Sequence, residues 1–265
     1  MLRLGPLLRV AAVLLAVTPL AAQTGPAQPA IPVELAVATA RFPHDPQAFT
    51  EGLFIDAGQM FESTGEVGRS SVRQVDLKTG KVLRSVTIPP PQFGEGIAPW
   101  NGQILSLTWQ DGVGYRWSRK GFKRLGSFKY DGEGWSLTST GTELVMSDGT
   151  DTLRFVDPRT FTVKRTLKVT VQGRALNRIN ELEWVNGQIL ANVWQTDYVV
   201  RIDPLSGKVV GLIDLTQLHR EAGRFGQDQV ANGIAWDSRT RKLYFTGKEW
   251  PVLFEVKLVP AGKPG

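Results

Sequence analysis

Short apolar runs separated by turn residues recur along most of the chain. Asn101-Gly102 stands directly before the apolar run 103–109, and Asn186-Gly187 stands directly before the run 188–194. Asn-Gly between two apolar runs is a strong signal for a β-hairpin, because both residues accept the positive φ of a type I′ turn. The pattern therefore predicts many short antiparallel strands, and residues 215–222 alone have a pattern that favours a short helix.

Five similar segments recur at intervals of roughly 40–50 residues. They begin at Glu51, Glu95, Glu133, Asn180 and Asn232. Each beginning is followed by a strand, a turn and a second strand, and the earlier segments continue into a third and a fourth strand. Four antiparallel strands in a repeat of this length are typical of a β-propeller blade. We therefore predict an all-β chain folded as a five-bladed β-propeller; the alternative, a β-sandwich, gives no reason for five similar units.

The last repeat shows three strands only, over residues 233–236, 242–247 and 252–258. Residues 33–42, which precede the first repeat, also have a strand pattern and no other partner in the series. We expect this N-terminal strand to supply the missing outer strand of the last blade, so that the ring has no open end. The propeller would then be a single domain over residues 33–265.

Residues 1–22 have the pattern of a secretory signal. Arg3 and Arg9 precede the apolar stretch 10–17, and Leu20-Ala21-Ala22 offers a small-residue cleavage site. The apolar stretch is too short to span a membrane as a helix, and a membrane-anchored start is the alternative. Residues 23–32, rich in Ala, Pro and Gln, are expected to form a linker. The sequence thus predicts a periplasmic or secreted protein that does not associate with a membrane once the signal is cleaved.

Composition narrows the possible functions. The formal net charge is +6, but the basic residues are scattered, which argues against nucleic-acid binding. The absence of Cys excludes disulfides and thiol catalysis, and two His argue against a His-rich zinc site. His44 lies in a Pro-flanked turn and is expected to be structural, whereas His219 lies in a polar stretch and is expected to be exposed to solvent. We expect a monomer that needs no metal and no cofactor.

The blade geometry indicates where a site would form. The start of the first strand and the end of the second strand of each blade lie on the same face, so these positions converge on one mouth of the central channel. The strand ends bring Trp109, Trp194 and Lys248 to the Glu and Asn residues that begin the repeats. Apolar walls with a few polar groups are typical of a ligand pocket. Capping of turns is the alternative role of each Glu or Asn, and packing between blades is that of each Trp.

An ordered series of motifs resembles the signatures of the plant and bacterial glutaminyl-peptide cyclotransferases. The first motif is the run 42–53, FPHDPQAFTEGL. The others follow in the same order: Phe93-Gly94-Glu95-Gly96, Leu107-Thr108-Trp109, Asp131-Gly132-Glu133-Gly134-Trp135, Ser147-Asp148-Gly149, Ile179-Asn180-Glu181-Leu182-Glu183, Ala191-Asn192-Val193-Trp194, Asn232-Gly233-Ile234-Ala235 and Thr246-Gly247-Lys248. The resemblance covers residues 33–258. It implies a five-bladed propeller enzyme that converts the N-terminal glutamine of peptides or proteins into pyroglutamate and releases ammonia.

The resemblance also implies roles for single residues. The catalytic acid and base falls on Glu95, and Asn180 and Lys248 fall on positions that polarise the γ-carbonyl of the substrate. The substrate pocket falls on Phe49, Phe93, Trp109, Trp135 and Trp194. One position departs from the plant pattern, which has Gln where this chain has Glu51. A second carboxylate beside Glu95 would raise one pKa of the pair, and could also help to hold the substrate ammonium.

These residue types suit an intramolecular acyl transfer that needs no metal. The substrate α-amine attacks its own side-chain amide, so a pocket that holds the compact conformer supplies much of the catalysis. One carboxyl can take the proton of the amine and deliver it to the departing ammonia, while a cation and an amide stabilise the oxyanion. Two alternatives remain open. One is a non-catalytic exported propeller that binds peptides or proteins, and the other is a metal-dependent, lactonase-like hydrolase with ligands from Glu51, Glu95, Asn180 and Asn232.

Overall fold

The computed structural model describes residues 30–262, and almost every regular element within them is a β-strand. The predicted signal segment 1–22 lies outside the described residues, as do residues 23–29 of the predicted linker. Ile31 already packs against a buried apolar cluster, and the first strand begins at Val33. The all-β prediction is confirmed.

Three separate sheets share one design, in which four strands pair antiparallel with their neighbours in chain order. The first sheet contains β2 (Thr50–Asp56), β3 (Gln59–Thr64), β4 (Ser71–Val75) and β5 (Val82–Thr87). The second contains β6 (Gly94–Trp100), β7 (Gln103–Thr108), β8 (Val113–Ser118) and β9 (Arg124–Lys129). The third contains β10 (Ser136–Ser139), β11 (Leu144–Ser147), β12 (Thr152–Val156) and β13 (Val163–Lys168). These strands follow the predicted repeats closely.

A fourth, eight-stranded sheet joins the N-terminal strand to the last two repeats. Its strands, in spatial order, are β16 (Ile179–Val185), β17 (Gln188–Val193), β18 (Tyr198–Ile202), β19 (Val209–Asp214), β1 (Val33–Pro43), β22 (Val252–Pro260), β21 (Lys242–Gly247) and β20 (Ala231–Asp237). β1 pairs antiparallel with β22, so the partner predicted for the N-terminal strand is confirmed. The first three residues of β1 also pair parallel with β19, which the repeat pattern did not predict.

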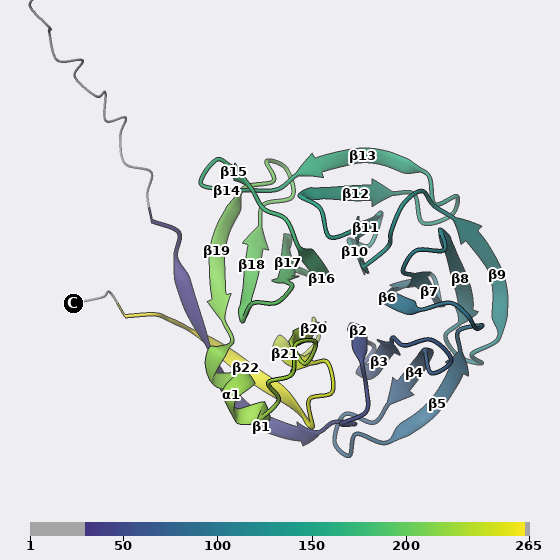
Figure 1. The fold of residues 1–265 in the computed structure, drawn as a ribbon, viewed down its shortest axis with the longest axis horizontal. Helices are drawn as coiled ribbons and strands as arrows, with labels where there is room; N and C mark the ends of the chain where they lie inside the picture. The colour runs from purple at the N-terminus through teal and green to yellow at the C-terminus, as the bar shows by residue number, and fades with distance from the viewer. Residues whose placement is uncertain (1–29, 263–265) are drawn as a thin grey trace, which may run out of the picture. The chain divides into compact units, whose positions relative to one another are not determined.

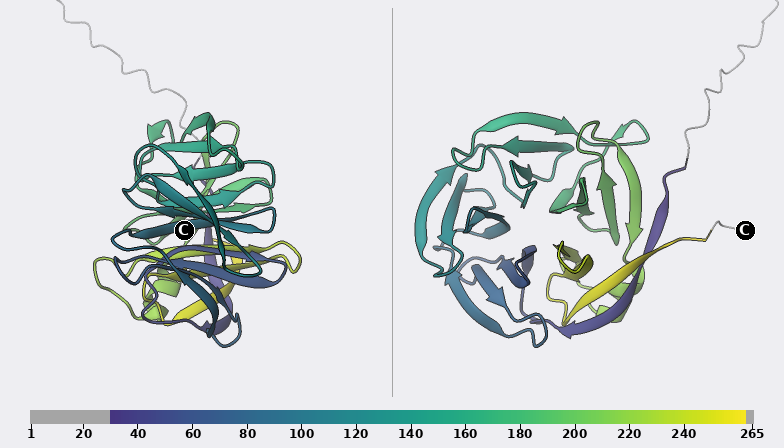
Figure 2. Two further views of the ribbon diagram at one scale, coloured as in Figure 1. Left: turned by 90° about the vertical axis from the view of Figure 1, so that its right-hand side faces the viewer. Right: turned by 180° about the vertical axis from the view of Figure 1, so that it is seen from behind.

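The sheets are arranged around a common axis in a propeller-like ring (Figure 1). The strands β2, β6, β10, β16 and β20 lie nearest the axis, while β5, β9 and β13 lie at the periphery. Figure 2 shows the same ring from the side and from behind. The apolar cores lie between neighbouring sheets; Phe54 and Phe61 of the first sheet, for example, pack against Ile97 and Trp117 of the second. The sides of the inner strands are therefore buried, and the ends of these strands lie around the central axis.

The turns and the helix agree with the sequence pattern, with one addition. Asn101 and Asn186 both have positive φ in the predicted hairpin turns, at 45° and 49°. The predicted helix is α1 (Thr216–Ala222), and it ends at Gly223 in the left-handed conformation that favours glycine. The short hairpin of β14 (Thr170–Val171) and β15 (Arg174–Ala175) was not predicted. No helix within residues 30–262 is long and apolar enough to cross a membrane.

The prediction made for one histidine is confirmed, and the prediction made for the other is wrong. The ring of His44 is buried between a Glu62 carboxylate oxygen, at 2.9 Å, and the Trp250 carbonyl, at 2.7 Å, which confirms its structural role. The expectation for His219 is wrong, because its side chain is only 15% exposed. His219 contacts Asp197 at 2.6 Å and stacks on Trp250. Its polar neighbours gave no indication that the helix would pack on this indole.

Candidate active site

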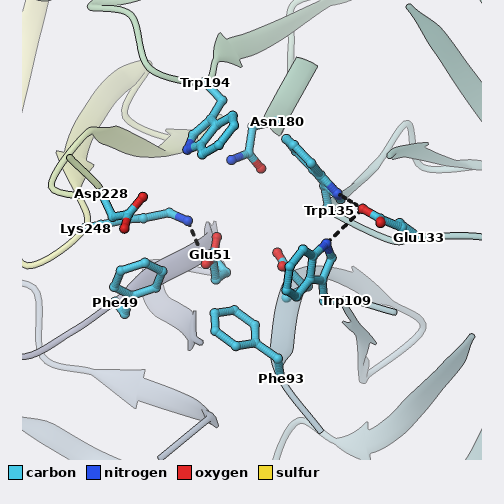
Figure 3. Close-up of a pocket in the computed structure, with 11 residues that line it drawn as sticks. Phe49, Glu51, Phe93, Trp109, Glu133, Trp135, Asn180, Trp194, Asp228 and Lys248 are labelled. Carbon is cyan, nitrogen blue, oxygen red and sulfur yellow. Dashed lines mark hydrogen bonds and ion pairs between the residues drawn. The ribbon is translucent and has the colours of Figure 1, made fainter. Parts of the chain in front are cut away.

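A cavity of about 380 Å³ opens among the ends of the inner strands (Figure 3). It is lined by Phe49, Glu51, Phe93, Glu95, Trp109, Glu133, Trp135, Asn180, Trp194, Asp228 and Lys248. All nine residues predicted for the site are among them. The chain positions of these nine are far apart, and the ring brings them together.

The inner strands present their polar side chains through irregular strand starts. The register between β2 and β3 shifts between Thr50 and Gly52, next to Glu51. The same shift occurs around Glu95 in β6 and around Asn180 in β16. A β-bulge redirects a side chain that regular alternation would place elsewhere. Glu51, Glu95 and Asn180 each lie within such a shift, and all three line the cavity.

Lys248 and Glu51 form a buried ion pair. Lys248 directly follows β21, and its Nζ lies 2.7 Å from Glu51 Oε1 and 4.3 Å from the centre of the Phe49 ring. Asn232 donates its side-chain amide to Glu51 Oε2, at 3.2 Å, and to the Thr50 carbonyl, at 2.8 Å. Asn232, which the strand geometry predicted at the channel mouth, thus lies behind Glu51 rather than in the cavity lining.

The carboxyls of Glu51 and Glu95 are both buried in the lining of the cavity. Burial, and then the negative charge of Glu51, raise the pKa of Glu95 well above its ordinary range. Burial also raises the pKa of Glu51 to about 7, although Lys248 acts in the opposite direction. Glu95 is therefore the member of the pair that keeps its proton at neutral pH, and Glu51 is the one that ionises first.

Aromatic rings form the walls of the cavity in two runs of edge contacts. Trp135 meets Trp194 at a centroid distance of 5.7 Å. Trp109 meets Phe93 at 6.0 Å, and Phe93 meets Phe49 at 6.0 Å. Rings in such contacts restrict one another and exclude water from the polar groups below them.

Asn180 is the unpaired polar group of the cavity. Its side chain is 3% exposed and points into the cavity, and its Oδ1 has no hydrogen-bond partner among the described residues (Figure 3). Its backbone carbonyl accepts a hydrogen bond from the Ser147 hydroxyl at 2.7 Å, which fixes the position of the residue. A buried acceptor without a partner is costly, so the position suits a hydrogen-bond donor of a ligand, such as an amide or amine N–H.

Sequence reasoning did not assign two of the lining residues. Glu133 begins a repeat, but the chemistry considered gave it no role. Asp228 lies in the loop between α1 and β20, outside the repeat pattern, so no periodic signal indicated it. Within residues 30–262, no group of three or more His, Cys, Asp or Glu is arranged to hold a metal ion. Of the four residues considered as metal ligands, Glu51 is paired with the Lys248 ammonium and accepts the side-chain amide of Asn232.

Three comparisons with known proteins agree. Residues 10–258 match the model of the glutamine cyclotransferase family. The chain is 42% identical over 227 residues to a glutaminyl-peptide cyclotransferase of Arabidopsis thaliana, over 84% of this chain and 71% of the relative. The crystal structure of a glutaminyl cyclase from Myxococcus xanthus matches with a TM-score of 0.83 at 35% identity, covering 88% of this chain and 100% of that one. The region that matches the family model includes every residue that lines the cavity.

Proposed function

This chain belongs to the glutamine cyclotransferase family, and we propose on that basis that it converts the N-terminal glutamine of peptides or proteins into pyroglutamate, with release of ammonia. The observation that carries the proposal is the content of one cavity. A proton-bearing carboxyl, an ammonium and an unpaired amide lie together beneath aromatic walls. The reaction needs a proton carrier, an oxyanion site and an apolar enclosure, and these groups supply all three.

The aromatic walls hold the substrate glutamine in a compact conformer. Cyclisation requires the α-amine to reach the side-chain amide carbon of the same residue, so restricting the chain raises the rate. Trp109, Trp135 and Trp194 contact the methylene groups from one side, and Phe93 and Phe49 from the other. The peptide beyond the first residue leaves through the mouth of the cavity.

The carboxyl pair moves the protons. With one proton and one negative charge between them, Glu95 and Glu51 can accept a proton from the attacking amine and deliver one to the departing ammonia. The amine loses one proton and the leaving NH2 gains one, so the pair returns to its starting state after each turnover. Glu95 serves as the proton donor of the pair, because its raised pKa keeps it protonated near neutral pH.

Lys248 and Asn180 stabilise the tetrahedral intermediate. Carbonyl addition places a negative charge on the former amide oxygen, and preorganised donors in a dry site lower the energy of that charge. The Lys248 ammonium is already held at Glu51, and Asn180 lines the same cavity, where its side-chain NH2 would donate to the oxygen. Binding of the carbonyl between them would orient it for attack.

The finer architecture follows from the sheet order. We read the eight-stranded sheet as two four-stranded blades, β16 to β19 and β20 to β22 with β1, joined by the short parallel contact of β1 with β19. With the three separate sheets this gives a five-bladed propeller. Two features support it: the five repeats of the sequence, and a pairing of only three residues between the two halves of the large sheet.

The cellular setting follows from residues 1–22. We propose that the protein acts as a monomer in the periplasm or outside the cell, free of the membrane after the signal is removed. Its partners would be exported peptides or proteins that begin with glutamine. The two early arginines, Arg3 and Arg9, and the cleavage site of the signal pattern support this setting.

The activity is tested by incubating purified protein with Gln-Ala and measuring ammonia release together with the pyroglutamyl product. N-acetyl-Gln-Ala is the matched control, because its blocked nitrogen cannot attack. Ammonia from Gln-Ala alone is the expected result, with or without a chelator. Ammonia from both peptides would indicate an amidase, and loss of activity with the chelator would favour the metal-dependent alternative.

A further inference from the structure

Glu133 joins two walls of the cavity through one carboxylate. It lies in the turn before β10, and its Oε2 accepts the indole N–H of Trp109 and that of Trp135, each at 2.8 Å (Figure 3). Its Oε1 accepts the side-chain amide of Gln110 at 3.0 Å. Trp109 follows β7 and Trp135 precedes β10, so the carboxylate links residues of two different sheets.

The backbone around Glu133 is held in place on both sides. Arg154 donates to the carbonyl of Glu133 at 2.7 Å and to that of Asp131 at 2.6 Å. The next backbone N–H, that of Gly134, donates to the Trp109 carbonyl at 2.9 Å. The carboxylate therefore projects from a fixed turn, and its position can determine that of the indoles.

The aromatic wall depends on this link. Ring contacts join Trp194 to Trp135 and join Trp109 to Phe93, while Trp109 and Trp135 are joined to each other through Glu133. Trp109 is 38% exposed, so packing alone does not fix its ring. An indole that is free at its N–H end can adopt other rotamers, and ordering it again costs free energy when a ligand binds.

The charge of Glu133 strengthens the link. Partial burial raises the pKa of its carboxyl, but the donors Trp135, Gln110 and Trp109 outweigh burial and hold the pKa below its ordinary value. The group is thus ionised at neutral pH, and its hydrogen bonds are charge-assisted. The same negative charge contributes to the raised pKa of Glu95.

We propose that Glu133 is a positioning residue that clamps the indoles of Trp109 and Trp135 in the orientation that encloses the substrate glutamine. The inference rests on the proposed cyclase function. It adds to that function a residue that does not touch the reacting atoms and acts through the two indoles.

The test compares Glu133→Ala with Glu133→Gln. The alanine variant should lower kcat/KM for Gln-Ala by about 10- to 100-fold, mainly through KM, since two charge-assisted hydrogen bonds to the walls are lost. The inhibition constant of the product pyroglutamyl-alanine should rise by a similar factor. The glutamine variant should stay within about threefold of the wild type at its pH optimum, because one amide oxygen can accept both indole protons. Its kcat/KM profile should have the alkaline limb at lower pH, because loss of the charge near Glu95 lowers the pKa of that acid.

Glu143→Ala is the matched control, because Glu143 is a partly buried glutamate whose ion-pair partner is Lys164, and it is not among the residues that line the cavity. It should leave both kinetic constants unchanged. A Glu133→Ala variant that folds and keeps the wild-type KM overturns the proposal, as does a glutamine variant as impaired as the alanine variant.

A second readout does not depend on turnover. The indole N–H signals of Trp109 and Trp135, assigned with Trp109→Phe and Trp135→Phe, should exchange with solvent faster in Glu133→Ala and shift little in Glu133→Gln. Unchanged exchange in Glu133→Ala would overturn the clamp even if the wild type were an active cyclase. If the wild type released no ammonia while the exchange changed as expected, the proposed function would fail and the clamp would stand.

Discussion

At the scale of single residues, the chemistry of the site depends on two carboxyls that share a proton. Burying a carboxylate is costly unless it is paired, and Glu51 has Lys248 and Asn232 as partners. Glu95 is buried and has the Glu51 carboxyl as its neighbour, and both raise its pKa, so it retains a proton. One member of the pair is thus held as an anion and the other as an acid.

Glu95→Gln should keep the fold and lose cyclisation. The change is nearly isosteric, but the new amide cannot deliver a proton to the departing ammonia and take one up again. We expect kcat to fall by at least about 100-fold, the scale of losing a general acid or base, with little change in Tm. Measuring both quantities decides the matter, since a residue that only supports the strand turn would show a lower Tm and near-normal kcat.

Glu51→Gln should move the pH dependence of the reaction. The Glu51 charge raises the pKa of Glu95, so its removal lowers that pKa and lets Glu95 ionise at lower pH. The wild-type pair should titrate in two steps, and the variant in one step that lies below the last ionisation of the wild type. The profile of kcat/KM against pH measures this. An unchanged alkaline limb, where Glu95 loses its proton, would contradict the coupling of the two carboxyls.

At the scale of the elements, the inner strands are tied together by buried carboxyls of β16. Glu181 accepts the backbone N–H of Leu53 at 3.3 Å and that of Ile234 at 3.0 Å. Glu183 accepts the N–H of Trp236 at 2.9 Å and the hydroxyl of Thr138 at 3.1 Å. These side chains satisfy backbone donors of neighbouring inner strands, which would otherwise be left without partners around the axis.

The stability of the Glu183→Gln variant relative to the wild type should increase as the pH rises. Burial raises the pKa of Glu183 to about 8, above the value of about 4.3 in an unfolded chain. Between these values the folded protein binds the extra proton, so wild-type stability falls as the pH rises through this range. Glutamine carries no such proton. The Tm of the variant relative to wild type should rise by at least about 5 °C between pH 5 and pH 8.

Calorimetry at the two pH values measures this difference. A variant whose Tm relative to the wild type is the same at both would show that Glu183 does not titrate in the folded state over this range.

At the scale of the whole molecule, β1 holds the ring together from both sides. It pairs with β22 along most of its length and with β19 through its first residues, so it lies inside a sheet rather than at an edge. Ala36 of β1 is 2% exposed and belongs to the apolar cluster that contains Leu215 and Phe254. The N-terminal strand therefore contributes to the apolar cluster that lies between the last two repeats.

Ala36→Asn should destabilise the ring. It places an amide in an apolar cluster without a partner, at a cost of about 3 kcal/mol, which corresponds to a decrease in Tm of roughly 6–12 °C. Leu35→Asn is the matched control in the same strand, because Leu35 is 39% exposed, and it should change Tm far less. Equal effects of the two substitutions on Tm would show that burial of β1 side chains does not stabilise the closed ring.

The processed protein should begin at Gln23, directly after Leu20-Ala21-Ala22. Because such an N-terminus is itself a substrate of the proposed reaction, we expect the exported wild type to carry pyroglutamate there, formed by a second copy or by the same one. Mass spectrometry of the N-terminal peptide measures both features. Protein found intact from Met1 would contradict export, and a freshly exported wild type with as much unmodified Gln23 as Glu95→Gln would contradict self-modification.

The repeat, the strand order within each repeat and the antiparallel partner of the N-terminal strand could be predicted from the sequence. Turn signals and alternation are local properties, and a series of similar units that lacks one strand at its end has one natural completion. It also indicated all nine predicted residues of the cavity, partly through strand starts and ends and partly through the resemblance of short motifs. These positions follow from chain order, because the ring repeats the same geometry in each unit.

The interactions between those residues could be seen only in the folded structure. The parallel contact of β1 with β19, the stacking of His219 on Trp250 and the place of Asp228 depend on segments that meet across the molecule and leave no periodic signal. The raised pKa of Glu95 depends on burial and on the distance to Glu51, and the role of Glu133 depends on two indoles from different sheets. Such properties arise from distances between elements, which a one-dimensional pattern does not contain.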